Sequence, residues 1–144
     1  MVAKPIGAAA VILDDDGRVL LVKHTYGRLN WELPGGVAEA NESAEETAMR
    51  EIREETGLRV RVERFAGIYY ERAVDMHHFV FVCHPLDASQ VAQPDRVEIS
   101  ACGYWPPDDL PRPISDFTMR RVRDALVGSS AISLVSVPPR QWFE

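Results

Sequence analysis

Apolar runs separated by short polar breaks predict strands over the first quarter of the chain. Residues 6–13 and 18–24 favour β-structure, and they flank a turn that contains an Asp-Gly pair, Asp16 and Gly17. This pattern predicts a hairpin. A polar loop over 26–30 and a short extended piece over 31–36 follow it, and the extended piece ends in two glycines.

The pattern then changes to that of an amphipathic helix. Ser43 and Glu46 have the spacing of a capping box, in which each side chain bonds a free N–H of the first turn. Gly57 can adopt the left-handed conformation that ends a helix. The buried stripe is predicted from apolar residues that recur every four positions, Ala44, Ala48 and Ile52.

Further strands are expected beyond this helix. Residues 58–62 alternate apolar and charged side chains, 65–70 are rich in aromatic residues, 76–84 are apolar on both faces, and 97–105 resume strand character. His77 and His78 on one of these strands would point to opposite faces, so a shared metal is not expected.

A second helix is predicted to start at Ser115 or Asp116 and to end before Gly128. Its core face is expected from Phe117, Met119, Val122 and Leu126, and its exposed face from Arg120, Arg121 and Arg123. The element order β-β-β-α-β-β-β-α indicates an α/β protein, and we expect a single domain over residues 1–144.

The last stretch, residues 129–144, is unusually apolar for a chain end. We expect it to add an edge strand or to contact a second subunit, and we favour a homodimer for this reason.

Composition narrows the function. A chain of 144 residues with 46% hydrophobic residues can bury a core without disulfides or structural metals. The 22 acidic against 16 basic residues give a net charge of −6, which argues against a nucleic-acid polymer as partner. The two cysteines are expected to be reduced. The apolar run over 5–13 is too short to cross a bilayer and no export signal is seen, so we expect a cytoplasmic protein without a membrane partner.

Three carboxylates crowd one turn of the first helix. Glu51, Glu54 and Glu55 are three and four residues apart, and like charges at these spacings repel. A Glu-rich helix is most often a solvated face, but Glu51 and Glu55 flank the apolar stripe and should lie at the edge of a cleft. A divalent cation would offset the repulsion, and an all-oxygen site favours Mg²⁺ or Mn²⁺.

The sequence around these carboxylates resembles a known family. Residues 36–58 match the Nudix hydrolase signature G-x5-E-x7-R-E-U-x-E-E-x-G-U, where U is aliphatic. We call this segment the Nudix box, or simply the box. Every specified position agrees: Gly36, Glu42, Arg50, Glu51, Ile52, Glu54, Glu55, Gly57 and Leu58. The resemblance implies a Nudix-type α/β/α sandwich with a mixed β-sheet and metal-dependent hydrolysis of a diphosphate bond in a nucleoside diphosphate-X compound.

Roles follow from the chemistry of substitution at phosphorus. Glu54 and Glu55 are expected as the main metal ligands, and Glu51 as a further ligand or as the base that activates water; spacing alone does not separate these roles. Gly35 and Gly36 are either simple turn residues or, as we favour, a close backbone approach that offers the Gly35 carbonyl to the metal.

Supporting roles come from the resemblance only. It implies that Arg50 orients Glu54 and that Glu42 braces the loop by pairing with Arg50. A carboxylate downstream of the box often completes the metal shell in this family, and Glu98 is the candidate, with an ordinary surface glutamate as the alternative.

The substrate is inferred by elimination. In the Nudix family, the ADP-ribose branch often carries a Pro and the dinucleoside polyphosphate branch a Tyr shortly after the box, and residues 72–75 contain neither. The resemblance therefore favours a nucleoside triphosphate, ordinary or oxidised, which would give monophosphate and pyrophosphate. ADP-ribose, a nucleotide sugar or a dinucleoside polyphosphate remain alternatives. A non-catalytic nucleotide-sensing module is disfavoured because no box carboxylate is lost. Five aromatic residues are candidates to stack on a base: Tyr26, Trp31, Tyr69, Tyr70 and Tyr104.

Overall fold

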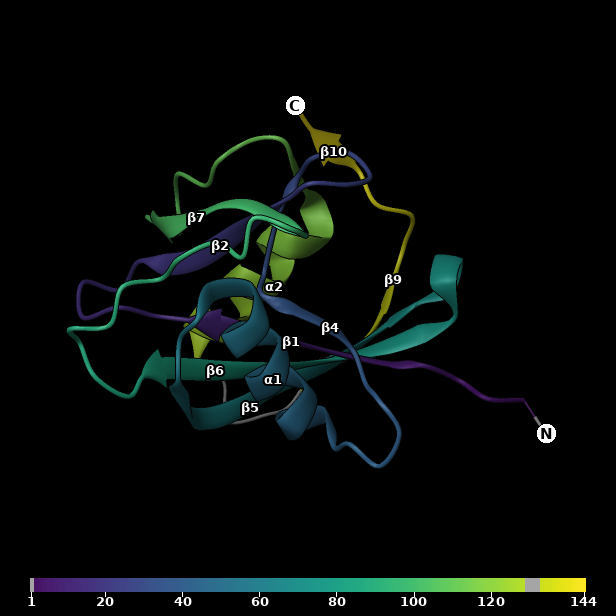
Figure 1. The fold of residues 1–144 in the computed structure, drawn as a ribbon. Helices are drawn as coiled ribbons and strands as arrows, with labels where there is room; N and C mark the ends of the chain where they lie inside the picture. The colour runs from purple at the N-terminus through teal and green to yellow at the C-terminus, as the bar shows by residue number, and fades with distance from the viewer. Residues whose placement is uncertain (1, 129–132) are drawn as a thin grey trace.

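The computed structural model describes residues 2–128 and 133–144, which form two mixed five-stranded sheets and two α-helices (Figure 1). The first sheet has the order β4 (Gly35–Val37), β1 (Ile6–Ile12), β6 (Met76–Pro85), β5 (Val60–Glu71) and β9 (Ser133–Val137). The second has the order β10 (Trp142–Phe143), β8 (Ile114–Ser115), β3 (Trp31–Glu32), β2 (Val19–His24) and β7 (Ile99–Trp105). The helices are α1 (Ala44–Thr56) and α2 (Asp116–Val127), and a short 3₁₀ turn, η1 (Arg72–Val74), joins β5 to β6.

Both faces of strand β1 are covered by packed side chains. Ala8, Ala10 and Ile12 pack in a cluster with Ala48 and Ile52 of α1. The alternate residues Ala9 and Val11 pack in a second cluster, which contains side chains of α2 and of the second sheet. Because successive side chains of a strand point to opposite faces, an apolar β1 can join both layers. The predicted α/β/α sandwich with mixed sheets is confirmed.

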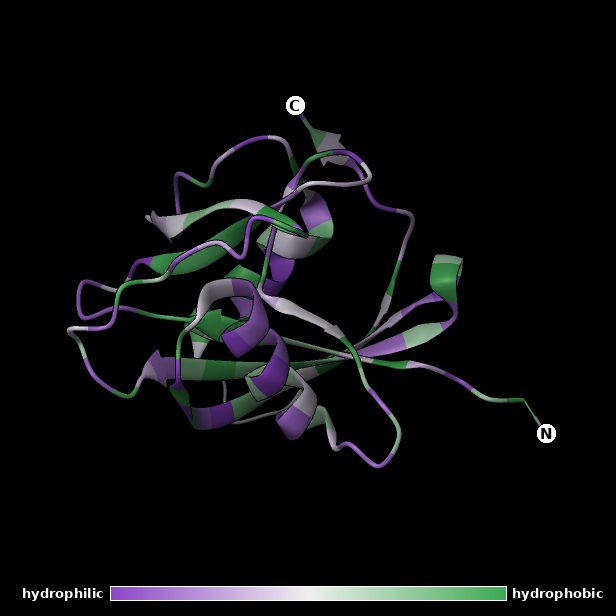
Figure 2. Ribbon diagram, viewed as in Figure 1, coloured by the Kyte–Doolittle hydropathy of each residue, from purple (hydrophilic) through white to green (hydrophobic). Residues whose placement is uncertain are grey.

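Helix α1 forms where the capping signals predict it. The Ser43 hydroxyl accepts from the Glu46 N–H at 3.1 Å, and the Glu46 carboxylate accepts from the Ser43 N–H at 3.0 Å. Gly57 ends the helix with φ of 75°. The face with Ala48 and Ile52 is buried, whereas most of the helix is hydrophilic (Figure 2). This amphipathic helix is held by tertiary packing on β1.

The predicted hairpin of the first two strands is wrong. Strand β1 pairs with β4 and β6, whereas β2 pairs with β3 and β7 in the other sheet. A single bridge, Leu13 to Val19, connects the two strands next to the turn. The Leu13 N–H donates to the Cys83 carbonyl of β6 at 3.0 Å, so β1 stays in the first sheet while the chain crosses to the second.

Helix α2 also differs from its predicted faces. It starts after the cap Ser115, as predicted, but Arg121 is only 3% exposed, so its assignment to the wet face is wrong. Arg121 follows Phe117 by one turn and therefore shares its buried side. Met119 and Leu126, expected in the core, are 38% and 39% exposed.

The C-terminal stretch is integrated into both sheets. Strand β9 pairs in parallel with β5 at the edge of the first sheet, and β10 pairs with β8 at the edge of the second. Residues 129–132, the start of the stretch discussed above, lie outside the described residues. In the part of the chain that is described, no helix has the length and apolar character needed to cross a bilayer.

Replacing Ile52 by Ala tests the contact between α1 and β1. The side chain is fully buried, so the variant should lose about 2–5 kcal/mol of unfolding free energy through lost burial and a residual cavity. Met49→Ala is a matched control on the same helix, because Met49 is 42% exposed. Urea unfolding would measure both, and equal losses would contradict the packing described here.

Candidate active site

Arg50 forms ion pairs with several carboxylates of the box. Its guanidinium donates to both oxygens of Glu42, at 2.7 and 2.9 Å, and one nitrogen also donates to Glu51 at 3.0 Å and to Glu54 at 3.1 Å. A further bond goes to the Val37 carbonyl at 3.2 Å. The hydrogen bonds from Arg50 lower the pKa of the Glu42 carboxyl to about 2. Arg50 therefore ties the loop before α1 to two of the three clustered carboxylates.

The three clustered glutamates lie at different depths. The Glu54 side chain is 55% exposed, that of Glu51 is 14% exposed, and Glu55 is buried. Strand β4 closes the inner side: the Gly35 N–H donates to Glu55 at 2.8 Å, and a Cβ on Gly36 would lie 2.5 Å from a Glu51 oxygen. A side chain at position 36 would therefore displace the Glu51 carboxylate from its present position, so Gly36 allows the strand and this carboxylate to lie in contact.

Burial raises the pKa of Glu55 to about 9, because a carboxylate in this position is shielded from water. The bond from the Gly35 N–H acts in the opposite direction, and the negative charges of Glu51, Glu98 and Asp95 add to the increase. Burial likewise raises the pKa of Glu51, against the effect of Arg50. Burial therefore favours the protonated form of both inner carboxyl groups.

Glu98 lies close enough to the box for its charge to act on Glu51 and Glu55. It is exposed, in a loop that the Asp95 side chain holds by accepting from the backbone N–H groups of Val97, Glu98 and Ile99 at 2.9–3.1 Å. The Glu98 carbonyl accepts from the Thr25 N–H at 2.8 Å, which joins this loop to the end of β2.

The donor set fits a hard divalent cation. The Glu55 carboxylate bonds the Gly35 N–H, the Glu51 carboxylate lies against Gly36, and one Arg50 nitrogen joins Glu51 to Glu54. Oxygen atoms such as these are the ligands that Mg²⁺ and Mn²⁺ prefer. Within residues 2–128 and 133–144, no three acidic, His or Cys side chains converge tightly enough to form a metal site by themselves. The gathering of the Glu51 and Glu54 carboxylates on one Arg50 nitrogen, next to the buried Glu55, is the observation that favours a cation.

A cavity of about 150 Å³ runs from the box into the space between the two sheets. Gly35, Gly36 and Val37 form one side, and Tyr26 and His24 are at another; their rings stack at 4.5 Å between centroids. The remaining walls come from both sheets, α2 and the C-terminal tail: Ala8, Ala9, Glu32, Leu33, Met76, His78, Arg121 and Arg140.

Of the five candidate aromatic residues, the structure brings only Tyr26 to this cavity. Trp31 packs edge-on against Trp105, and Tyr69 is fully buried with its hydroxyl bonded to Asp124 at 2.9 Å. Tyr70 bonds Asp75, and Tyr104 lines a different depression. The sequence identifies the aromatic residues but not which way each strand faces.

Sequence reasoning missed the charged residues inside this cavity. Glu32 accepts from Arg121 at 2.7 Å and from Arg140 at 3.1 Å, and Glu71 accepts from Arg140 at 2.8 Å. Despite burial, the two arginines lower the pKa of Glu32 to about 2. The sequence offers a signal only at Glu32 and Arg140, each of which is a single charge in an otherwise uncharged segment.

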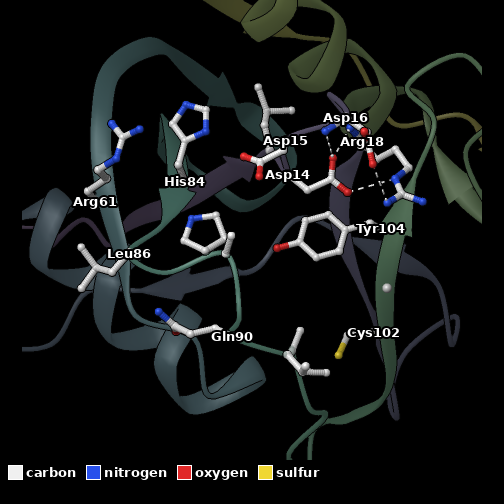
Figure 3. A pocket seen from close by; sticks show the side chains of 16 residues that line it. Asp14, Asp15, Asp16, Arg18, Arg61, His84, Leu86, Gln90, Cys102 and Tyr104 are labelled. Atoms are coloured by element: carbon white, nitrogen blue, oxygen red, sulfur yellow. Dashed lines mark hydrogen bonds and ion pairs between the residues drawn. The ribbon is translucent and has the colours of Figure 1, made fainter.

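A larger depression of about 660 Å³ lies at the other end of the molecule, and Figure 3 shows its side chains. Arg18 there is already paired with Asp14 at 2.9 Å and with Asp16 at 3.2 Å. Neither depression is lined by a box carboxylate, but Gly36 and Val37 of the box line the smaller cavity, and the Glu51 carboxylate lies against Gly36, so the smaller cavity is the better candidate for substrate.

Comparison with known proteins agrees with this geometry. The family model for the NUDIX domain matches residues 3–126, and the chain belongs to the Nudix hydrolase family. A "MutT-like protein" of Streptomyces ambofaciens is 33% identical over 124 residues, which cover 86% of this chain and 78% of that protein.

Two further proteins illustrate the range of the similarity. A Bacillus subtilis (strain 168) protein named "Putative 8-oxo-dGTP diphosphatase" is 32% identical over 129 residues, covering 89% of this chain and 84% of the relative. The crystal structure of an ADP-ribose pyrophosphatase from Streptococcus suis 89-1591 superposes with a TM-score of 0.73, covering 94% of this chain and all of that one. At 24% identity, this second match shows the shared fold.

The raised pKa of Glu55 predicts a pH-dependent effect of Glu55→Gln in the metal-free protein. The folded-state pKa of about 9 exceeds the ordinary value, so the folded chain retains a proton that the unfolded chain releases. This contribution to stability is fully present below the unfolded-state pKa and is lost as the pH rises toward about 9. The variant has no such loss, so its stability relative to the native chain should be greater at pH 8 than at pH 5.

Urea unfolding with a chelator present would measure this difference. Glu45→Gln, on the exposed side of the same helix, is the control and should show a difference that does not change with pH. The same flat result for Glu55→Gln would contradict the assigned burial effect.

Proposed function

We propose that this protein hydrolyses a diphosphate bond in a nucleoside diphosphate derivative with the help of Mg²⁺ or Mn²⁺. The favoured reaction is the conversion of a nucleoside triphosphate to the monophosphate and pyrophosphate. The observation that carries the proposal is the end of α1, where Glu55 accepts from the Gly35 N–H, Glu51 lies against Gly36, and Glu54 shares an Arg50 nitrogen with Glu51.

The side chains divide the work. Glu54 and Glu55 would hold the cation, with Glu98 and the Gly35 carbonyl as further oxygen ligands, and the bound cation would neutralise charge on the phosphate oxygens. Glu51 would accept the proton of the attacking water, since its raised pKa brings it nearer the operating pH of a general base.

Arg50 and Glu42 would act by positioning. Arg50 donates to Glu51 and Glu54 through one nitrogen, and Glu42 fixes the opposite side of the guanidinium by accepting two bonds. Bidentate pairing of this kind restricts the orientation of the guanidinium, and therefore of the two carboxylates that it contacts.

A nucleoside triphosphate fits because the cavity begins at the box. The phosphates would lie at the carboxylates, and the base would enter the space beside Gly36 and Tyr26. The similarity to the Bacillus subtilis relative supports the same class of substrate. A panel of ordinary and 8-oxidised triphosphates, ADP-ribose and a nucleotide sugar, analysed for products, tests this choice. Cleavage of ADP-ribose alone would overturn it.

Replacing Glu54 by Gln should reduce the release of pyrophosphate by about 10²-fold or more, in the range typical for loss of a group that acts in catalysis. The amide keeps the shape but loses the charge that would hold the cation. Glu45→Gln removes a charge from the first turn of the same helix and should retain native activity. Equal product release from the native chain and Glu54→Gln would favour a nucleotide-sensing module instead.

Removal of divalent cations should abolish hydrolysis. Dialysis against a chelator should leave no measurable product, and Mg²⁺ or Mn²⁺ should restore it, because the carboxylate oxygens form a hard-cation site. Isothermal titration of the metal-free protein would show whether the native chain binds the cation more tightly than Glu54→Gln. Activity that is unchanged in chelator would refute the metal-dependent reaction.

A further inference from the structure

A chain of buried charges forms the wall of the cavity opposite the box. Arg140 donates to both oxygens of Glu71, at 2.8 and 3.2 Å, and to Glu32 at 3.1 Å. Arg121 donates to the other oxygen of Glu32 at 2.7 Å, and His78 lies 3.0 Å from Glu71. Five ionisable groups from α2, three strands and the tail therefore meet between the sheets.

Arg140 comes from a part of the chain outside the matched family domain, which ends at residue 126. The tail that carries it is fixed at the neighbouring residue: the Gln141 N–H donates to the Asp116 carboxylate at 2.9 Å, and the Asp116 N–H donates back to the Gln141 carbonyl at 2.9 Å. Strand β10 then continues the second sheet. The guanidinium of Arg140 lies 5.0 Å from the Phe117 ring, a further contact that limits its position.

The same tail also contacts the loop that carries Tyr26, a residue of the cavity wall. Trp142 lies under the Arg28 guanidinium at 4.6 Å, and Glu144 pairs with Arg28 at 3.5 Å. Arg28 is in the loop that carries Tyr26, whose ring stacks on His24 at the cavity wall. The tail thus supplies a polar group inside the cavity and a support for the aromatic residue at its entrance.

The cavity favours a neutral planar group. Its volume of about 150 Å³ is similar to that of an engineered cavity in another protein that holds benzene, so one aromatic ring fits well inside. Two carboxylates face two guanidinium groups, so a charged ligand group would be left without a partner in a buried place. A neutral heterocycle with hydrogen-bonding edges avoids this cost.

We propose that Arg140 is a specificity-determining residue that donates to the carbonyl edge of an oxopurine base, of the guanine type, in the cavity between the sheets. The inference rests on the proposed hydrolysis of a nucleoside diphosphate derivative. A guanidinium is the side-chain group that most often reads the O6 and N7 acceptors of guanine, and a carboxylate such as Glu32 can accept from the N–H groups of the same base. Adenine offers an amino donor where guanine has O6, so it is a poorer partner for Arg140.

The test uses nucleosides without phosphate, so that neither metal nor hydrolysis is needed. Guanosine and adenosine are titrated into the full ¹⁵N-labelled chain, and the amide shifts of Gly35, Gly36 and Val37 are followed together with the Arg140 Nε–H. Guanosine should bind about tenfold more tightly than adenosine, as one good bidentate contact allows, and should shift both sets of signals.

Arg140→Lys keeps the positive charge beside Glu32 and Glu71 but loses the planar fork. It should weaken guanosine binding by about tenfold and adenosine binding by less than about threefold, so the preference is lost. Arg123→Lys, on the exposed side of α2, is the control and should bind both nucleosides like the native chain. If Arg140→Lys does not fold, the Arg140 Nε–H shift in the native chain decides the question.

Two results would overturn the inference: guanosine that leaves the cavity amides and the Arg140 Nε–H unshifted, or a folded Arg140→Lys protein with an unchanged preference. Triphosphate hydrolysis that persists alongside either result would leave the proposed function intact. Guanosine binding at these residues without hydrolysis of any diphosphate compound would reject the proposed function and retain the base site.

Discussion

The pairing of β4 with β1 is the contact on which the site depends. Gly35 lies opposite Ala9 and Gly36 opposite Ala8, so the strand just before the box is held in the first sheet. A Cβ on Gly35 would lie 2.7 Å from the Ala9 Cα, and a Cβ on Gly36 would overlap the Glu51 carboxylate. The two glycines therefore allow a strand to fit between β1 and the acidic edge of α1. Small residues also matter on the face of β1 that packs against α1, where Ala8 and Ala10 let the helix approach closely.

The electrostatics of the box are only partly balanced. One guanidinium, Arg50, serves Glu42, Glu51 and Glu54, and its bonds hold the pKa of Glu42 at about 2. Glu55 is buried on the inner side, and burial raises its pKa to about 9 against the effect of the bond from the Gly35 N–H. Glu42 and Glu55 thus differ widely in pKa because Glu42 is bonded to Arg50 whereas Glu55 is buried. A cation at the inner side would reverse the sign of the local effect and favour the charged form of Glu55.

The local signals in the sequence were sufficient for α1, for its caps and for the positions of the box residues along it. The caps, the apolar stripe and the box spacing each depend on residues within one helix, where separation along the chain determines separation in space. Pairings between distant segments were not accessible in this way. The hairpin between the first strands was wrong because Leu13 bonds to β6, which lies 70 residues further along. Arg121 was assigned to water because its partner Glu32 is 89 residues away in sequence, and a charge is normally exposed unless it is paired.

The groups proposed for hydrolysis and the groups proposed for base recognition come from different parts of the chain. The carboxylates belong to α1, within the matched domain, whereas Arg140 and the support for Tyr26 come from the tail beyond it. Arg140 and the box residues Gly36 and Val37 line one cavity, and the Glu51 carboxylate lies against Gly36, so a substrate held by its base would have its phosphates placed near the carboxylates. Binding energy at the base contributes to the reaction when it fixes that placement, not when it only tightens binding. If Arg140 reads the base as proposed, the buried ion pairs that orient it before a ligand enters leave little ordering to oppose binding, and changes in the tail would alter the choice of base without changing the box residues.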